Sequence, residues 1–148
     1  MKIISHRGNL NGPCKALENS VPYINIALNN GFDVELDIRY IDNRLYLGHD
    51  EPQYEASIDW LLEHKDKLLI HCKNIEAMNV FSKMGSLFHF FGHDNDLFVL
   101  TSRRYIMTIP KTNLVSNSIL VMPEFFGFKE QNFSCAAVLT DYPFKYKA

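Results

Sequence analysis

Two carboxylates separated by one residue, Glu35 and Asp37, lie in an otherwise apolar segment. They alternate with three apolar residues, Val34, Leu36 and Ile38. In a strand, whose side chains alternate between faces, both carboxylates point to the same face. A half-exposed surface strand shows the same alternation, with both acids in water. In a buried strand the two like charges need a cation, water or hydrogen-bond donors, and a divalent metal ion is the simplest compensation. The pair is therefore a candidate metal site.

Other polar side chains follow the ends of neighbouring predicted strands. A strand over 2–5 leads into His6 and Arg7, one over 44–47 leads into His49, and one over 68–74 carries His71 and Lys73 at its end. The ordinary pKa of histidine suits proton transfer near neutral pH. Cations and histidines beside a carboxylate pair indicate a reactive site.

Strands and helices alternate through the first half of the chain. The strands at 2–5, 34–38 and 68–74 are separated by helices predicted at 21–28 and 58–62, and a helix predicted at 75–84 follows the third strand. Such alternation with short connections is typical of parallel βαβ units, whose functional residues gather at the carboxyl ends of the strands. Later segments read as strands without intervening helices: 87–91, 97–101, 105–110, 118–122 and 136–140.

Composition limits the class of protein. The 148 residues suit a single domain over 1–148, and the net charge of -2, from 15 basic and 17 acidic residues, disfavours nucleic acid as a partner. Three cysteines without Cys-x-x-Cys spacing favour a reducing compartment over a disulfide framework. The sequence shows neither a secretory signal nor an apolar run of membrane-spanning length, so we expect a cytoplasmic protein with a small-molecule partner.

Four short motifs follow one another in the first fifty residues: His6-Arg7-Gly8, Glu18-Asn19-Ser20, Glu35-x-Asp37 and Gly48-His49-Asp50. In this order and approximate spacing they resemble the glycerophosphodiester phosphodiesterases and their relatives in the phosphatidylinositol phospholipase C-like superfamily. The segment Leu139-Thr140-Asp141-Tyr142-Pro143 resembles the last strand of that family. The resemblance covers residues 1–74 well and 136–143 in part.

The resemblance implies an α/β fold of the (β/α) triosephosphate isomerase (TIM) barrel type and a metal-dependent hydrolase of lipid metabolism. It also implies site roles: His6 and His49 as acid and base, Glu35 and Asp37 as ligands of a divalent cation, Arg7 and Lys73 as phosphate contacts, and Glu18 and Asn19 as residues that brace the site or contact the phosphate. Phosphodiester cleavage needs a base, an acid and positive charge on the phosphate oxygens, which this set supplies.

One position departs from the family pattern, which has a glutamate two residues before Lys73. Here that position is His71, a candidate third metal ligand with a nitrogen in place of a carboxylate oxygen. Mg²⁺ or Ca²⁺ is implied by the resemblance, whereas a histidine ligand shifts preference toward Mn²⁺ or Zn²⁺. Glu124 is a substitute ligand or, equally, a solvated loop acid.

Chain length is the second departure, because a complete barrel of this type has about 250 residues. We therefore expect a shortened or incomplete barrel in which loops replace the helices after Gly85, leaving part of the wall bare. The aromatic segment 125–128 then suggests a homodimer, with a buried core corner as the alternative.

Three functions remain open from the sequence. The first is a metal-dependent phosphodiesterase, the second is a phosphate-ligand binding or regulatory module with little or no catalysis, and the third is a transferase or lyase. The remaining histidines are predicted to be structural: His64 at a solvated helix end, His89 in the core or lumen, and His93 in a turn.

Overall fold

A curved ten-stranded sheet is the framework of the computed structural model, which describes residues 1–129 and 133–147. Neighbouring strands from β6 to β8 pair in parallel. Their order is β6 (His89–Phe91), β5 (Leu68–Cys72), β2 (Asp33–Ile41), β1 (Lys2–His6), β10 (Ala137–Thr140), β9 (Ser118–Val121) and β8 (Ile106–Thr108). Beyond β8, β7 (Phe98–Leu100) pairs antiparallel.

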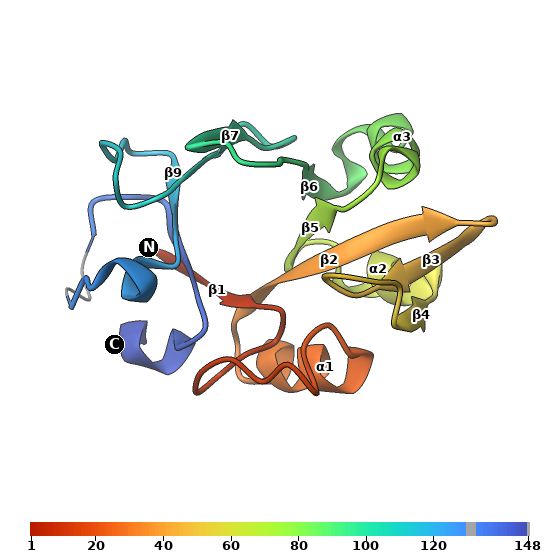
Figure 1. Ribbon diagram of the computed structural model, residues 1–148, viewed down its shortest axis with the longest axis horizontal. Helices are drawn as coiled ribbons and strands as arrows, with labels where there is room; N and C mark the ends of the chain where they lie inside the picture. The colour runs from red at the N-terminus through yellow and green to blue at the C-terminus, as the bar shows by residue number, and fades with distance from the viewer. Residues whose placement is uncertain (130–132, 148) are drawn as a thin grey trace.

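The sheet curls around a common centre (Figure 1). Its two ends meet just after β7, where the Ser102 amide donates to the Phe90 carbonyl at 2.9 Å and the Phe90 amide donates to Ser102 Oγ at 2.9 Å. The architecture is a shortened TIM-type barrel, which confirms the predicted fold class. β7 differs from the expected pattern because it runs against its neighbour.

Three α-helices lie outside the barrel: α1 (Val21–Asn29), α2 (Ile58–His64) and α3 (Ile75–Lys83). Ser57 Oγ caps α2 by accepting from the Trp60 amide at 3.2 Å, as predicted, and Asn74 caps α3. After α3 the described helical segments are the short 3₁₀ turns η1 (Gly85–Leu87), η2 (Pro123–Phe126) and η3 (Pro143–Tyr146). The prediction that loops replace the later helices is confirmed.

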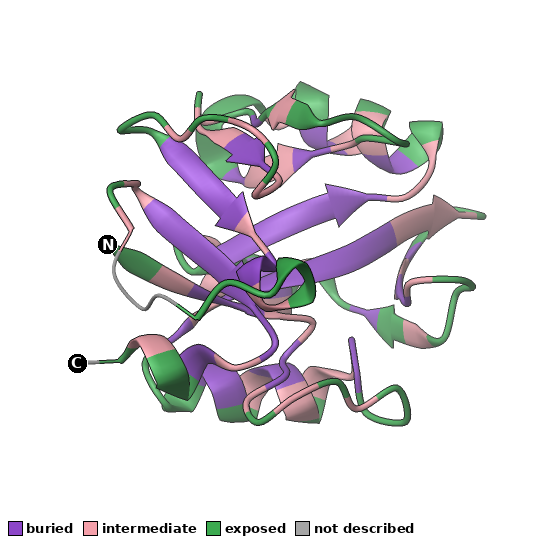
Figure 2. Ribbon diagram, turned by 60° about the vertical axis from the view of Figure 1, so that its left-hand side comes forward, coloured by how far each residue is buried: buried purple, intermediate pink, exposed green. Residues whose placement is uncertain are grey.

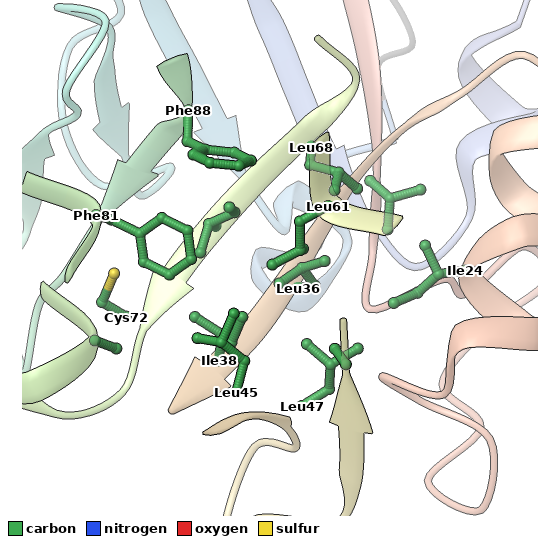
Figure 3. Packing of buried hydrophobic residues seen from close by; sticks show 14 of the residues in the cluster. Ile24, Leu36, Ile38, Leu45, Leu47, Leu61, Leu68, Cys72, Phe81 and Phe88 are labelled. Atoms are coloured by element: carbon green, nitrogen blue, oxygen red, sulfur yellow. The ribbon is translucent and has the colours of Figure 1, made fainter. Parts of the chain in front are cut away.

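The barrel strands have two apolar faces with separate cores. Outward-facing residues of β2 and β5, including Leu36, Ile38 and Leu68, pack with the helices around Phe81 and Phe88 (Figure 3). A second cluster fills the lumen: Ile4, Leu69, Phe91, Met107, Ile119, Met122, Ala137 and Leu139. Figure 2 shows buried residues concentrated in the strands. Because Leu36 and Ile38 face outward, alternation directs Glu35 and Asp37 into the lumen.

A hairpin extends the long strand β2 beyond the barrel. β3 (Arg44–Leu47) pairs antiparallel with β2, and β4 (Tyr54–Ala56), which was not predicted, pairs with β3. The two-residue turn Asp42-Asn43 has φ of 48° and 62°. Positive φ at both positions is the requirement of a type I′ hairpin, and Asn and Asp tolerate it. The hairpin returns the chain toward the site at residues 48–50.

The aromatic segment after β9 lies on the surface. Phe125, Phe126 and Phe128 are 65%, 38% and 40% exposed, so the alternative of a buried core corner is wrong, while the homodimer stays a prediction. Among the described residues, the helices fall short of the length and apolar character needed to cross a membrane.

Candidate active site

Glu35, Asp37 and His71 meet inside the barrel, where the first half of β2 lies beside the carboxyl end of β5. The two strands are parallel, with Asp37 opposite His71, so alternation places all three side chains in the lumen. His71 Nδ1 lies 3.0 Å from Asp37 Oδ1 and 3.7 Å from Glu35 Oε1. One ligand atom from each residue lies within 4.8 Å of the others, and all three residues are buried. The sequence-predicted metal ligands therefore form one cluster.

The charges of this cluster match the needs of a cation. Burial, and then the neighbouring charge of Asp37, raise the pKa of Glu35, and its Oε2 atom is buried without a hydrogen-bond partner. Burial alone would raise the pKa of Asp37 too, but hydrogen bonding to His71 and the charge of Arg7 lower it overall. Burial lowers the pKa of His71, which favours the neutral ring that a metal requires. The three residues fit a divalent cation.

Arg7 is held against the cluster by two ion pairs. Its Nε lies 2.9 Å from Asp37 Oδ2, and its Nη1 donates to Glu18 Oε2 at 3.2 Å. The side-chain nitrogen Nδ2 of Asn19 donates to Asp37 Oδ2 at 2.9 Å, and Asn19 Oδ1 accepts from the backbone amide of Asp37 at 2.9 Å. Glu18 and Asn19 thus hold Arg7 and Asp37 in place, while their roles in a reaction stay predictions.

The backbone at Arg7 and Asn19 adopts the left-handed region, with φ of 55° and 64°. Non-glycine residues seldom do so, and such residues cluster at functional sites. The backbone amide of Asn19 donates to the Arg7 carbonyl at 3.1 Å, and the backbone amide of Arg7 donates to the Glu35 carbonyl at 2.9 Å. These bonds tie the loop to β2 and hold both unusual conformations.

His6 lies opposite Glu35 on β1 and pairs with Asp141 from the end of β10. Its Nδ1 is 2.7 Å from Asp141 Oδ1. Burial would lower the pKa of His6, but the hydrogen bond to Asp141 and the charge of Glu35 outweigh it, so the pKa is raised. Asn9, fully buried, donates to Asp141 at 2.7 Å and to Glu18 at 2.9 Å. Asp141 therefore orients the His6 ring through Nδ1.

We expect the change Asp141→Asn to lower the pKa of His6, since it removes the anion that stabilises the charged ring. The titration of the His6 ring, followed by NMR, should move to lower pH. Circular dichroism of the variant is the control for the fold. An unchanged His6 titration would contradict the assigned pairing.

His49 lies at the rim of the site. Two guanidinium nitrogens of Arg39 donate to the carbonyls of Gly48 and His49 and fix the loop. The His49 side chain is 40% exposed, and its Nδ1 lies 2.7 Å from Asp50 Oδ1. It lines a pocket of about 370 Å³. The other lining residues are Arg7, Lys15, Glu18, Asn19, Asp50, Glu51 and Gln53. His49 and Arg7 thus share one pocket.

Three further residues clarify the site. Lys73 follows β5, half-buried, and its charge favours the ionised form of Glu35. Glu124 is not a member of the metal cluster of described residues: its Oε1 accepts from Thr140 Oγ1 and from the Asp141 amide, each at 2.8 Å. It supports Asp141, so neither expectation for Glu124 is correct. His93, predicted only to shape a turn, stacks on His71.

Comparison with known proteins gives a likeness of structure and none of sequence. No protein-family model matches the chain, and no curated protein matches it in sequence. A crystal structure of glycerophosphodiester phosphodiesterase from Agrobacterium tumefaciens str. C58 superimposes with a TM-score of 0.57. The match has 14% identity and covers 99% of this chain and 98% of that chain. At this identity the likeness establishes that the two proteins share a fold.

Proposed function

We propose that residues 1–148 form a single-domain, metal-dependent phosphodiesterase that cleaves a glycerophosphodiester or a related sugar or polyol phosphodiester. The observation that carries the proposal is the position of the His6–Asp141 pair beside Glu35, at the same end of the barrel as the Glu35–Asp37–His71 cluster. The fold shared with a glycerophosphodiester phosphodiesterase supports it.

Binding of the phosphate falls to Arg7 and Lys73. Arg7 uses Nε and Nη1 in its ion pairs with Asp37 and Glu18, so Nη2 is available to a phosphate oxygen. Lys73 adds a second positive charge at the end of β5. A divalent cation held by Glu35, Asp37 and His71 would neutralise charge on the phosphate and polarise it. These groups stabilise negative charge where the reaction develops it.

Proton transfer falls to His6 and His49. His6 is oriented by Asp141 through Nδ1, so its Nε2 can accept or donate a proton at the reacting oxygen. His49 reaches the same pocket as Arg7 from the opposite loop. One ring deprotonates the attacking water or substrate hydroxyl, and the other protonates the leaving oxygen. A neighbouring substrate hydroxyl as nucleophile would first give a cyclic phosphate.

A phosphate-ligand binding module on the same barrel is the alternative function. The exposure of His49, whose ring pairs only with the adjacent Asp50 among the described residues, favours it. Such a module would bind phosphodiesters through Arg7 and Lys73 without turning them over. Turnover separates the two functions directly.

Metal removal is expected to abolish hydrolysis of bis(p-nitrophenyl) phosphate, because without the cation the clustered carboxylates repel the phosphate and only Arg7 and Lys73 compensate its charge. Metal-stripped protein should regain activity when supplied with one of Mg²⁺, Ca²⁺, Mn²⁺ or Zn²⁺. The same ion should raise the unfolding temperature, since it binds the folded chain alone.

The control is the His49→Ala variant under identical conditions, and release of p-nitrophenol is the measurement. Hydrolysis that persists after metal stripping would contradict metal dependence. Binding of a glycerophosphodiester to metal-loaded protein without any product would instead support the binding module.

A further inference from the structure

Three rings stack at the edge of the metal cluster. The centroid of His71 lies 4.6 Å from that of Phe91 and 4.9 Å from that of His93, with interplanar angles of 13° and 12°. Phe91 and His93 are themselves 5.9 Å apart and tilted by 14°. Rings on opposite faces of His71 would be separated by roughly 7 Å or more, twice the contact distance between carbon atoms. Phe91 and His93 therefore cover the same face of His71.

This packing fixes the orientation of the His71 ring. Metal-binding histidines are usually oriented by a hydrogen bond from the second ring nitrogen to a carboxylate, carbonyl or water. Here His71 Nε2 is buried and has no hydrogen-bond partner among the described residues, while Nδ1 faces both carboxylates. The aromatic neighbours take the place of the usual hydrogen bond and hold Nδ1 toward the cluster.

The carboxylates offer few oxygens to a cation. Asp37 Oδ2 already lies 2.9 Å from both Arg7 Nε and Asn19 Nδ2, so Asp37 presents only Oδ1 to the cluster. Glu35 can present Oε1 and the unpartnered Oε2. Ca²⁺ takes about 6–8 oxygen ligands and Mg²⁺ also prefers oxygen. An oriented imidazole with one or two carboxylates suits a transition metal better.

We propose that this site selects a transition metal, such as Co²⁺ or Zn²⁺, over Mg²⁺ and Ca²⁺, and that His93 is a positioning residue that holds His71 as its nitrogen ligand. The inference rests on the proposed function in naming the metal of the same site. Its test measures binding of the metal itself and does not depend on turnover.

The experiment titrates metal-stripped protein with Co²⁺, Zn²⁺, Mg²⁺ and Ca²⁺ by calorimetry and records the visible absorption of bound Co²⁺. The wild type should bind Co²⁺ and Zn²⁺ at least tenfold more tightly than Mg²⁺. His93→Ala should weaken Co²⁺ binding by about 10- to 100-fold, as loss of outer-shell partners does, and alter the Co²⁺ absorption. His93→Phe should restore both, because it keeps a ring on His71. His64→Ala, at the end of α2, is the matched control.

His71→Glu tests the ligand itself. An oxygen ligand should lower the preference for Co²⁺ over Mg²⁺ at least tenfold, and circular dichroism shows whether the variant folds. If His71→Glu does not fold, the His93 variants still decide the test, because His93 is exposed.

The inference would be overturned by Mg²⁺ or Ca²⁺ binding as tightly as Co²⁺, or by His93→Ala leaving Co²⁺ binding unchanged. Failure of His93→Phe to restore binding would also overturn it, since the His93 nitrogen would then act as a ligand. Selective Co²⁺ binding by a protein that hydrolyses no phosphodiester contradicts only the proposed function.

Discussion

Replacing His6 with alanine is expected to lower the rate of phosphodiester cleavage by about a hundred- to ten-thousand-fold, the contribution of one general acid or base. His49→Ala should cause a loss in the same range. His6 is held by Asp141 and lies opposite Glu35, so its removal takes away the oriented proton-transfer group while the metal cluster persists. The measurement is kcat with the activating metal at saturation, which separates loss of chemistry from loss of metal.

His64→Ala is the control for the two histidine variants, because His64 contacts Trp60 at the end of α2, away from the catalytic machinery. Bound metal should be unchanged in His6→Ala. Turnover at the wild-type rate in either site variant would show that the assigned acid and base are wrong. If only His6→Ala lowers the cleavage rate, His49 merely lines the pocket, and another group carries out the second proton transfer.

Local sequence patterns predicted the position of the metal cluster. The alternation around Glu35 and Asp37 specified which residues share a face, and short connections between strands and helices specified parallel neighbours. These features predicted that polar residues of neighbouring strands gather at one end of the sheet, whereas His71 became a candidate ligand through the family resemblance. The same reasoning found α1, α2 and α3 within a few residues, because cap residues and Gly31 and Gly85 mark their ends.

The partners of the site residues lay beyond such patterns. Asp141 is separated from His6 by 135 positions, and Asn9 connects Asp141 with Glu18 through side-chain hydrogen bonds. The fold alone brings these groups together, so periodicity gives no sign of them. The tripeptide Gly-His-Asp at 92–94 repeats that at 48–50, a signal that could have directed attention to His93.

Strand direction was the other limit. Apolar segments predict strands but carry no sign of parallel or antiparallel pairing when no helix separates them. β7 therefore looked like another barrel strand, although it pairs antiparallel with β8. β4 was missed because Tyr54-Glu55-Ala56 is too short to show alternation.

Glu35→Gln is expected to weaken metal binding by more than about 10- to 100-fold. Loss of an outer-shell partner weakens binding by about that factor, and here the charge of a ligand itself is lost. In metal-free protein the same change should raise the free energy of unfolding at neutral pH, because a neutral amide removes the repulsion between the buried Glu35 and Asp37 carboxylates. Glu35 is buried beside Asp37, and the charges of Arg7 and Lys73 offset only part of the repulsion, so the neutral amide removes the remainder. Denaturant unfolding with and without metal measures both effects.

The unfolding free energy of the metal-free protein should also depend on pH through Glu35. Burial and Asp37 raise the pKa of Glu35 in the folded chain above its ordinary 4.5. At pH values between 4.5 and this raised pKa, the folded chain binds a proton that the unfolded chain has lost. The unfolding free energy of metal-free wild type should therefore fall as pH rises through this interval, and Glu35→Gln should remove that fall. Asp37, whose pKa is lowered, acts in the opposite direction at lower pH. If the ionised Glu35 serves only to bind the cation, it destabilises the metal-free fold, and neutralising it must raise the unfolding free energy. A Glu35→Gln variant that is less stable than wild type without metal would show that Glu35 also supports the fold.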